Sequence, residues 1–329
     1  MRIKVLFIIL LINFRVFSGE ARHLKPDFKI VGYYSIRSAM DDYNKFPFSR
    51  LTHVNLSFLN PDSLGNFTRD LSALKPFIAK AHKKNVKVLF SIAGGSVHPY
   101  YHTLLKEENR ARFIQNLLSQ VLNYNFDGID VDIEGSDIDE NYEVFVMDLA
   151  RELRLQHKLI TSAIAVYYKD QISDKAIAQY DFVNVMVYDR TGPWRPDKPG
   201  QHSSYADAVE DLEYFGTARN IPGGKMLLGV PFYGYGFGPE ISSPVKSMDY
   251  NEIVSAFPGS ESVDEWKTAD GNIMYYNGMP TIKKKTELAM GKASGIMIWQ
   301  VGGDAKGSKS LLKTIYKTAS GKKQNRIKG

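Results

Sequence analysis

The residues with the clearest chemical potential are the carboxylic acids of the segment Asp-Gly-Ile-Asp-Val-Asp-Ile-Glu at positions 127–134. Side chains alternate between two faces of a strand, so Asp130, Asp132 and Glu134 should point the same way, about 7 Å apart at each step. Three such groups in a poorly solvated interior repel one another unless at least one keeps a proton, which raises its pKa. A carboxylic acid that is protonated near neutral pH is what general acid catalysis of glycosidic cleavage requires.

Two other interpretations of this segment stay open from the residues alone. A solvated acidic edge strand would carry the charges, but Ile129, Val131 and Ile133 are apolar, as packing between a strand and helices requires. A divalent-metal site would use the carboxylates as ligands, but calcium needs roughly six to eight oxygen ligands, usually supplied by a loop. We expect neither a metal nor another cofactor, and we expect Asp127, which has the opposite parity, to be structural.

A strand with polar residues on one face must lie in a larger sheet. The sequence contains eight short apolar runs of the kind that fill a parallel sheet buried on both faces. These predicted strands are Lys29–Ser35, Leu51–Leu59, Val86–Ala93, Phe126–Ile133, Leu159–Ala165, Phe182–Tyr188, Met226–Tyr233 and Gly295–Val301.

Segments with apolar residues at three- and four-residue spacing separate these runs and predict helices. They are Leu71–Lys84, Glu107–Leu122, Tyr142–Leu155, Asp170–Gln179, Tyr205–Ala218, Ile282–Ala289 and Leu311–Ala319, while the connection around Ser38–Phe46 is poorly helical. Alternating strands and helices predict an α/β fold, a (β/α)8 TIM barrel that forms a single domain over residues 26–320. An open doubly wound sheet is the alternative. In either fold the chemistry gathers at the carboxyl ends of the strands.

The two ends of the chain differ from this pattern. Residues 1–18 combine basic residues, an apolar run and small residues before Gly19, which is typical of a secretory signal peptide. We therefore expect a secreted protein, extracellular or periplasmic, without stable membrane insertion. Residues 321–329 form a basic tail. The formal net charge of +6 arises largely from these two ends, so we expect no nucleic-acid partner. The sequence has no cysteine, and a chain of this length needs no disulfides. We expect a monomer.

The spacing Asp-x-x-Asp-x-Asp-x-Glu at residues 127–134 resembles the signature of the family 18 glycoside hydrolases, the chitinases and their relatives. Other segments that resemble the family follow in order along the chain, over about residues 29–316. They are Val31–Tyr34, Ser91–Gly95, Met186–Asp189, Gly229–Gly234 and Gly295–Trp299.

The resemblance implies retaining, substrate-assisted hydrolysis, an exception to the scheme with two catalytic carboxylates. The 2-acetamido carbonyl oxygen of the sugar would attack C1 and form an oxazolinium ion. Glu134 would protonate the leaving oxygen and later activate water. Asp132 would orient the acetamide N–H, Asp130 would share a proton with Asp132, and Tyr188 would donate to the acetamide oxygen. Ser91 would support the acidic strand from below.

By the same resemblance, other residues would bind the substrate. Trp299 would lie under the sugar at the cleavage point and Tyr33 beside its acetamido group, while Met186 and Asp189 would line the same pocket. Trp194, on the loop after the sixth strand, resembles a stacking platform for the next sugar.

The chain also departs from the family pattern. Ile133 and Gly135 stand where many members have Trp and Tyr, and Tyr235 stands where many have Arg. The segment 235–294 is too short to hold the extra α+β domain that deepens the cleft in many processive chitinases. We therefore expect a more open groove and endo-acting or oligosaccharide-directed activity.

The expected partners are chitin, chito-oligosaccharides or other glycans that contain N-acetylglucosamine. Hydrolysis of these β-1,4-linked polymers or oligomers is the leading prediction. Two alternatives remain: an endo-β-N-acetylglucosaminidase that acts on N-glycans, and a lectin that binds chitin without cleaving it. Because a non-catalytic relative usually loses the catalytic acid, the presence of Glu134 disfavours the lectin.

Overall fold

The computed structural model describes residues 27–321. The predicted signal peptide, residues 1–18, lies outside the described residues, as does the basic tail after Gly321, so both remain predictions. None of the helices within the described range has the length and apolar character of a membrane span.

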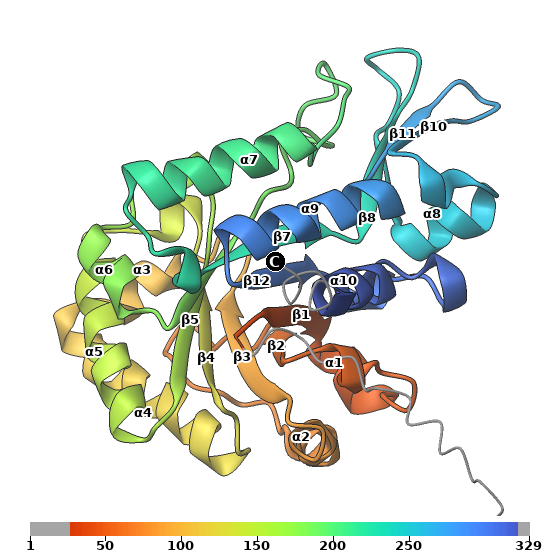
Figure 1. Ribbon diagram of the computed structural model, residues 1–329. Coiled ribbons are helices and arrows are strands. Elements are labelled where there is room, and N and C mark those ends of the chain that lie inside the picture. Colours follow the sequence, from red (N-terminus) through yellow and green to blue (C-terminus); the bar gives the residue numbers. More distant parts are fainter. Residues whose placement is uncertain (1–26, 322–329) are drawn as a thin grey trace, which may run out of the picture.

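Eight parallel strands close into a barrel, because β1 pairs with both β2 and β12 (Figure 1). The barrel strands are β1 (Lys29–Ser35), β2 (His53–Ser57), β3 (Lys87–Ala93), β4 (Gly128–Asp132), β5 (Leu159–Ile164), β6 (Phe182–Val185), β7 (Met226–Pro231) and β12 (Gly295–Trp299). Each lies within one of the predicted runs. The predicted TIM barrel is therefore confirmed, and the open sheet is excluded.

Helices surround the barrel and bury one apolar stripe each against it. On α4, for example, Phe113, Leu117 and Val121 are buried at intervals of four residues. The helices that follow the barrel strands are α1 (Ile36–Asp41), α2 (Lys75–His82), α3 (Tyr100–Leu104), α4 (Glu107–Asn123), α5 (Tyr142–Leu155), α6 (Asp174–Gln179), α7 (Tyr205–Glu213), α9 (Met279–Lys292) and α10 (Leu311–Gly321). The connection predicted to be poorly helical contains only the short α1.

The two faces of β4 have opposite surroundings. Ile129, Val131 and Ile133 are fully buried in the large apolar cluster between the strands and the helices. Asp130 and Asp132 are also buried, but they point into the barrel. β4 approaches β5 so closely that a Cβ atom at Gly128 would lie 2.2 Å from the carbonyl oxygen of Leu159, which explains the glycine in this segment.

Between β7 and α9 the chain forms a small antiparallel sheet and one helix, which lie beside α9 in Figure 1. The strands, in the order in which they pair, are β10 (Glu265–Lys267), β11 (Ile273–Tyr275), β8 (Tyr233–Phe237) and β9 (Lys246–Asp249), and the helix is α8 (Tyr250–Ala256). The segment thus adds a few short elements to the barrel, and no separate domain is evident. Its strand β8 carries side chains that reach the site described next.

Candidate active site

The carboxyl group of Asp130 lies deepest in the barrel and is held by four donors. The strand register places Ser91 and Thr161 on either side of it. Tyr33 and Ser91 donate to its Oδ2 atom at 2.6 and 2.8 Å, and Thr161 and Asn184 donate to its Oδ1 atom at 2.6 and 3.2 Å. Burial raises the pKa of Asp130, but the hydrogen bonds from Thr161, Tyr33 and Ser91 oppose that rise. Such bonds favour the ionised form.

Asp132 has the opposite environment two residues further along β4. Its carboxyl group is 3% exposed, and its Oδ1 atom has no hydrogen-bond partner among residues 27–321. Burial, together with repulsion from Glu134 and Asp130, raises the pKa of Asp132 well above its usual range. Of the two buried carboxyl groups, Asp132 therefore has the stronger tendency to keep a proton, because no donors within the described chain oppose the rise in its pKa as they do at Asp130. Its unpartnered oxygen can still accept a hydrogen bond from a ligand.

Glu134 lies just beyond the end of β4, where the barrel opens. Burial is the main cause that raises its pKa to about 7, and the charge of Asp189 adds to the effect, while interactions with Tyr168 and Asp132 oppose it. A carboxyl group with this pKa is largely protonated slightly below neutral pH and can give up its proton near pH 7. This property suits a general acid that must later act as a base.

The chain beyond β6 brings Met186, Tyr188 and Asp189 to the same opening. Burial raises the pKa of Tyr188 well above its usual range, so its hydroxyl remains a donor. Among residues 27–321, the hydrogen-bond acceptor of that hydroxyl is the sulfur of Met297, at 3.9 Å, and a thioether is a weak acceptor. The hydroxyl of Tyr188 is thus available to donate to a stronger acceptor.

Asp189 turns the chain away from the barrel with a left-handed backbone conformation, φ +63°. Its Oδ1 atom accepts hydrogen bonds from Tyr233 at 2.6 Å and from Tyr235 at 3.1 Å. Tyr235 is the residue that stands in place of the family's Arg, so two neutral hydroxyl groups contact the Asp189 carboxylate here. The charge of Asp189 therefore remains available to act on Glu134.

Aromatic side chains complete a pocket of about 380 Å³ above these groups. Trp299, at the end of β12, stacks on Phe58 with ring centroids 5.6 Å apart and meets the edge of Tyr33 at 5.4 Å. The residues that line the pocket are Phe58, Gly95, Asp132, Glu134, Tyr167, Met186, Tyr188, Asp189, Trp194 and Trp299. The volume lies within the range of small-molecule sites, which is about 300–1,000 Å³.

Two predicted site residues lie beneath the pocket and do not line it. Asp130 is fully buried, and Tyr33 is 1% exposed. Tyr33, expected to lie beside the sugar, donates a hydrogen bond to Asp130 from within the barrel and packs against Trp299. Ser91 also contacts Asp130, in the supporting position expected for it.

Trp194 stands on the loop after β6 and is 56% exposed. Its ring meets Tyr235 edge-on at 5.8 Å and lies so close to Gly192 that a Cβ atom there would be 2.7 Å from the indole. The loop thus folds the indole toward the pocket while leaving more than half of its surface open to solvent. An exposed aromatic ring in this place can stack on a ring of a ligand.

Sequence reasoning missed several residues of this site. Phe58 and Tyr167 follow β2 and β5, and both line the pocket. Thr161 and Asn184 are polar residues within otherwise apolar strands, and both donate to Asp130. Their signals were present, because an aromatic residue just after a strand and a polar residue inside one are both informative.

Asp127 and two histidines, His98 and His102, lie outside the pocket. Asp127 accepts hydrogen bonds from the ring of His82 and from the backbone N–H of Val88, both at 2.7 Å, which is a structural arrangement. His102 bonds to Asp139, and the backbone of His98 bonds to Asp137. Within residues 27–321 no group of three or more His, Cys, Asp or Glu side chains has the geometry to hold a metal ion.

Known proteins resemble this chain in sequence and in structure. A chitinase of Flavobacterium johnsoniae from a chitin utilization locus is 36% identical, with a TM-score of 0.80, and the match covers 92% of this chain and 99% of that one. For a chitinase of Bacteroides thetaiotaomicron the identity is 27%, the TM-score 0.75, and the covered shares 89% and 96%.

A curated relative, the probable chitinase 2 of Drosophila melanogaster, is 27% identical over 280 residues, which is 68% of this chain and 57% of that protein. The chain spans little more than half the length of this and other curated relatives that it matches. Residues 29–304 match the model of the glycosyl hydrolases family 18, and this range includes every strand of the barrel. The chain therefore belongs to family 18 of the glycosyl hydrolases.

Proposed function

We propose that this protein is a chitinase, which hydrolyses β-1,4-linked N-acetylglucosamine polymers or oligomers with retention and with Glu134 as acid and base. One observation supports this proposal most directly: the unpartnered, buried Oδ1 atom of Asp132 lies in an aromatic pocket beside Glu134 and Tyr188. A sugar that carries an N–H donor and a carbonyl acceptor on one substituent matches this pair of groups. The 2-acetamido group of N-acetylglucosamine is such a substituent.

In the first step, Glu134 gives its proton to the glycosidic oxygen while the acetamido carbonyl oxygen of the same sugar attacks C1. The C1–O bond to the leaving sugar breaks and an oxazolinium ion forms. The high pKa of Asp132 suits hydrogen bonding better than nucleophilic attack, because a nucleophile must be ionised. The substrate therefore supplies its own nucleophile.

Asp132 and Tyr188 hold the acetamido group in the position from which it attacks. Asp132 accepts from the N–H group and Tyr188 donates to the carbonyl oxygen. As positive charge develops on the ring, the proton on Asp132 can shift toward Asp130. There it competes with the four donors for the carboxylate oxygens of Asp130. In the second step, the Glu134 carboxylate takes a proton from water, and the water oxygen attacks C1. The bond between C1 and the acetamido oxygen breaks, which restores the acetamido group and gives a product of retained configuration.

The aromatic side chains provide the binding surface. Trp299, supported by Phe58, lies under the sugar whose bond breaks, and Trp194 stacks on the next sugar toward the reducing end. Sugar rings present apolar C–H faces, so such platforms bind them without fixing the chain length. The 36% identical chitinase from a chitin utilization locus supports the same substrate class.

Product analysis by mass spectrometry tests the proposal. The protein and its Glu134→Gln variant are incubated with chitotetraose, chitopentaose and chitohexaose and, in parallel, with a high-mannose N-glycoprotein. Cleavage of chito-oligomers by the unmodified protein alone is the expected result, and the product lengths give the endo or exo pattern. Released N-glycans with intact chito-oligomers would reassign the protein as an endo-β-N-acetylglucosaminidase. Binding without any cleavage would indicate a lectin.

We further propose that the protein is exported. The support is the leader pattern of residues 1–18, in which basic residues precede an apolar run and a small-residue cleavage point. Expression of the full chain in a secreting host should release a protein whose N-terminal residue is Gly19. Retention of the intact leader inside the cells would refute this proposal.

A further inference from the structure

A lysine without exposed surface lies behind the end of β6. Lys285, on α9, is 0% exposed. Its Nζ atom donates to the carbonyl oxygen of Ser203 at 2.9 Å, to the Oγ of Ser203 at 2.7 Å and to the Oδ1 of Asn277 at 2.8 Å. An ammonium group has three donors, so all three are used.

Burying this cation is costly, and burial lowers the pKa of Lys285 to about 7. Asp207, Asp264 and Asp211 act in the opposite direction, and Arg190 adds to the lowering. Within residues 27–321, however, Lys285 forms no ion pair, and its three acceptors are neutral. An apolar side chain at this place on α9 would avoid the cost, so the hydrogen bonds to Ser203 and Asn277 are what the lysine adds.

The lysine determines which way the Ser203 hydroxyl points. In its protonated form Lys285 can only donate, so the Oγ atom of Ser203 must accept there and direct its own proton elsewhere. That proton goes to the carbonyl oxygen of Val187, the residue before Tyr188. Asn277 closes the arrangement, because its Nδ2 atom donates to the carbonyl oxygen of Ser203 at 2.7 Å.

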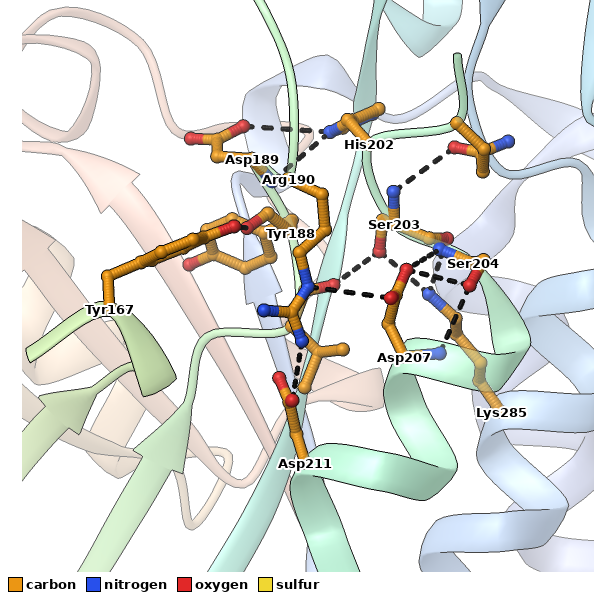
Figure 2. Close-up of polar contacts among 12 residues, drawn as sticks. Tyr167, Tyr188, Asp189, Arg190, His202, Ser203, Ser204, Asp207, Asp211 and Lys285 are labelled. Carbon is orange, nitrogen blue, oxygen red and sulfur yellow. Dashed lines mark hydrogen bonds and ion pairs between the residues drawn. The ribbon is translucent and has the colours of Figure 1, made fainter. Parts of the chain in front are cut away.

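The neighbouring residue, His202, holds the chain on the other side of Tyr188. Its carbonyl oxygen accepts from the backbone N–H of Arg190 at 3.0 Å. Its Nδ1 atom lies 3.5 Å from both the backbone nitrogen and the Oδ1 of Asp189 (Figure 2). Residues 202 and 203 therefore bracket Tyr188 and Asp189. The positive φ of Asp189, +63°, is unfavourable for a residue other than glycine, so this conformation is kept only where the surrounding contacts hold it.

We infer that Lys285 is a positioning residue for Tyr188 and Asp189, acting through the Ser203 hydroxyl and the Val187 carbonyl group. It touches no substrate. This inference rests on the proposed function, because Tyr188 and Asp189 act there on the acetamido group and on Glu134. When the hydrogen bonds of Lys285 and Ser203 are removed, the Tyr188 hydroxyl loses its alignment with the acetamide oxygen, although the aromatic binding surface stays intact.

Steady-state hydrolysis of chitotetraose tests the inference in two variants and one control. Lys285→Met removes all three donors at similar length, and Ser203→Ala removes only the hydroxyl. Lys284→Met, at an exposed position of the same helix, is the matched control. We expect kcat to fall about 10- to 100-fold in both test variants, the size of effect that a misplacement of about 1 Å produces, while KM changes less than about threefold. Lys284→Met should behave as the unmodified protein.

A second measurement separates positioning from a merely structural role. In each variant, affinity for a chitin-derived thiazoline, which resembles the oxazolinium ion, should fall as kcat/KM falls, whereas chitotetraose binding in the Glu134→Gln background should hardly change. A lower melting temperature with unchanged kcat and thiazoline affinity would overturn the inference. If Lys285→Met does not fold, the same measurements of kcat and thiazoline affinity on Ser203→Ala test the inference.

The failure of the proposed function has a different outcome. If the unmodified protein cleaves no chito-oligomer or N-glycan, the proposed function is wrong, and a crystal structure of Ser203→Ala then decides the inference. A changed backbone at Val187–Asp189 would support positioning by Ser203 and Lys285. An unchanged backbone, with Asp189 still in its left-handed conformation, would overturn it.

Discussion

The two sides of the pocket are built in different ways. On one side, Asp130 and Asp132 lie on β4, and Glu134 lies on extended chain just beyond its end, so one alternation points all three side chains inward. On the other side, Tyr188 and Asp189 lie beyond the end of β6 on irregular chain. They are held by residues distant in sequence, including Tyr235, 46 residues further along the chain.

This difference shows what each side depends on. The acidic side needs the barrel to close, because the supporting donors come from neighbouring strands in register. The side beyond β6 needs particular hydrogen bonds from a loop, from β8 and from α9. Substitutions on the acidic side should therefore change the chemistry directly, whereas those beyond β6 should change geometry or the local charge.

The largest effect should come from Glu134→Gln. The amide cannot donate a proton to the leaving oxygen, so we expect kcat to fall about 10⁴-fold, the upper end of the range for general acid catalysis. Binding of chitotetraose, measured by calorimetry, should be retained because the shape is kept. Since Glu134 is buried and its pKa is raised by burial, the glutamine variant should also be at least as stable as the unmodified protein at pH 8. Undiminished turnover would remove Glu134 from its assigned role.

Asp132→Asn should have the next largest effect. The asparagine amide is neutral and cannot become negatively charged, and it presents either its NH₂ group or its oxygen to the acetamido group. The step that forms the oxazolinium ion should therefore slow about 100-fold. Asp127→Asn is the matched comparison on the same segment, because Asp127 has the opposite parity and contacts His82 and Val88. Its kcat should stay near that of the unmodified protein. Equal losses in the two variants would contradict the alternation that distinguishes this side of the pocket.

The dependence of kcat/KM on pH should report the protonation of Glu134. The proposed reaction needs the protonated form, and burial raises the pKa of Glu134 to about 7. We therefore expect kcat/KM for chitotetraose to fall as pH rises through about 7, by about tenfold for each further pH unit. A profile that stays flat up to pH 9 would mean that another group supplies the proton.

The same contrast governs what the sequence could predict. Alternation along Asp130, Asp132 and Glu134 is a local property, so it predicted the inward face, and the apolar runs predicted all eight barrel strands. The contact between Ser203 and Lys285 joins residues 82 positions apart, and no short-range pattern reports it. Tyr33 lies between these two cases. Its place on β1 was predictable, but its hydrogen bond to Asp130 depends on how the side chains of distant strands pack inside the barrel.

The smallest effect should come from Tyr235→Phe, which removes one of the two hydroxyl groups on Asp189. Tyr233 keeps the shorter bond, at 2.6 Å against 3.1 Å, so the carboxylate should stay in place. Because only the longer of the two bonds is lost, kcat/KM should change only about two- to fivefold, less than the full value of a hydrogen bond to a charged group. The change should reach Glu134 through charge: with one donor fewer, Asp189 acts more strongly on Glu134, and the descending limb of the pH profile should move to higher pH. Tyr233→Phe is the comparison and should produce the larger shift. If both variants leave the profile unmoved, the charge of Asp189 does not tune the acid, and the side beyond β6 acts through geometry alone.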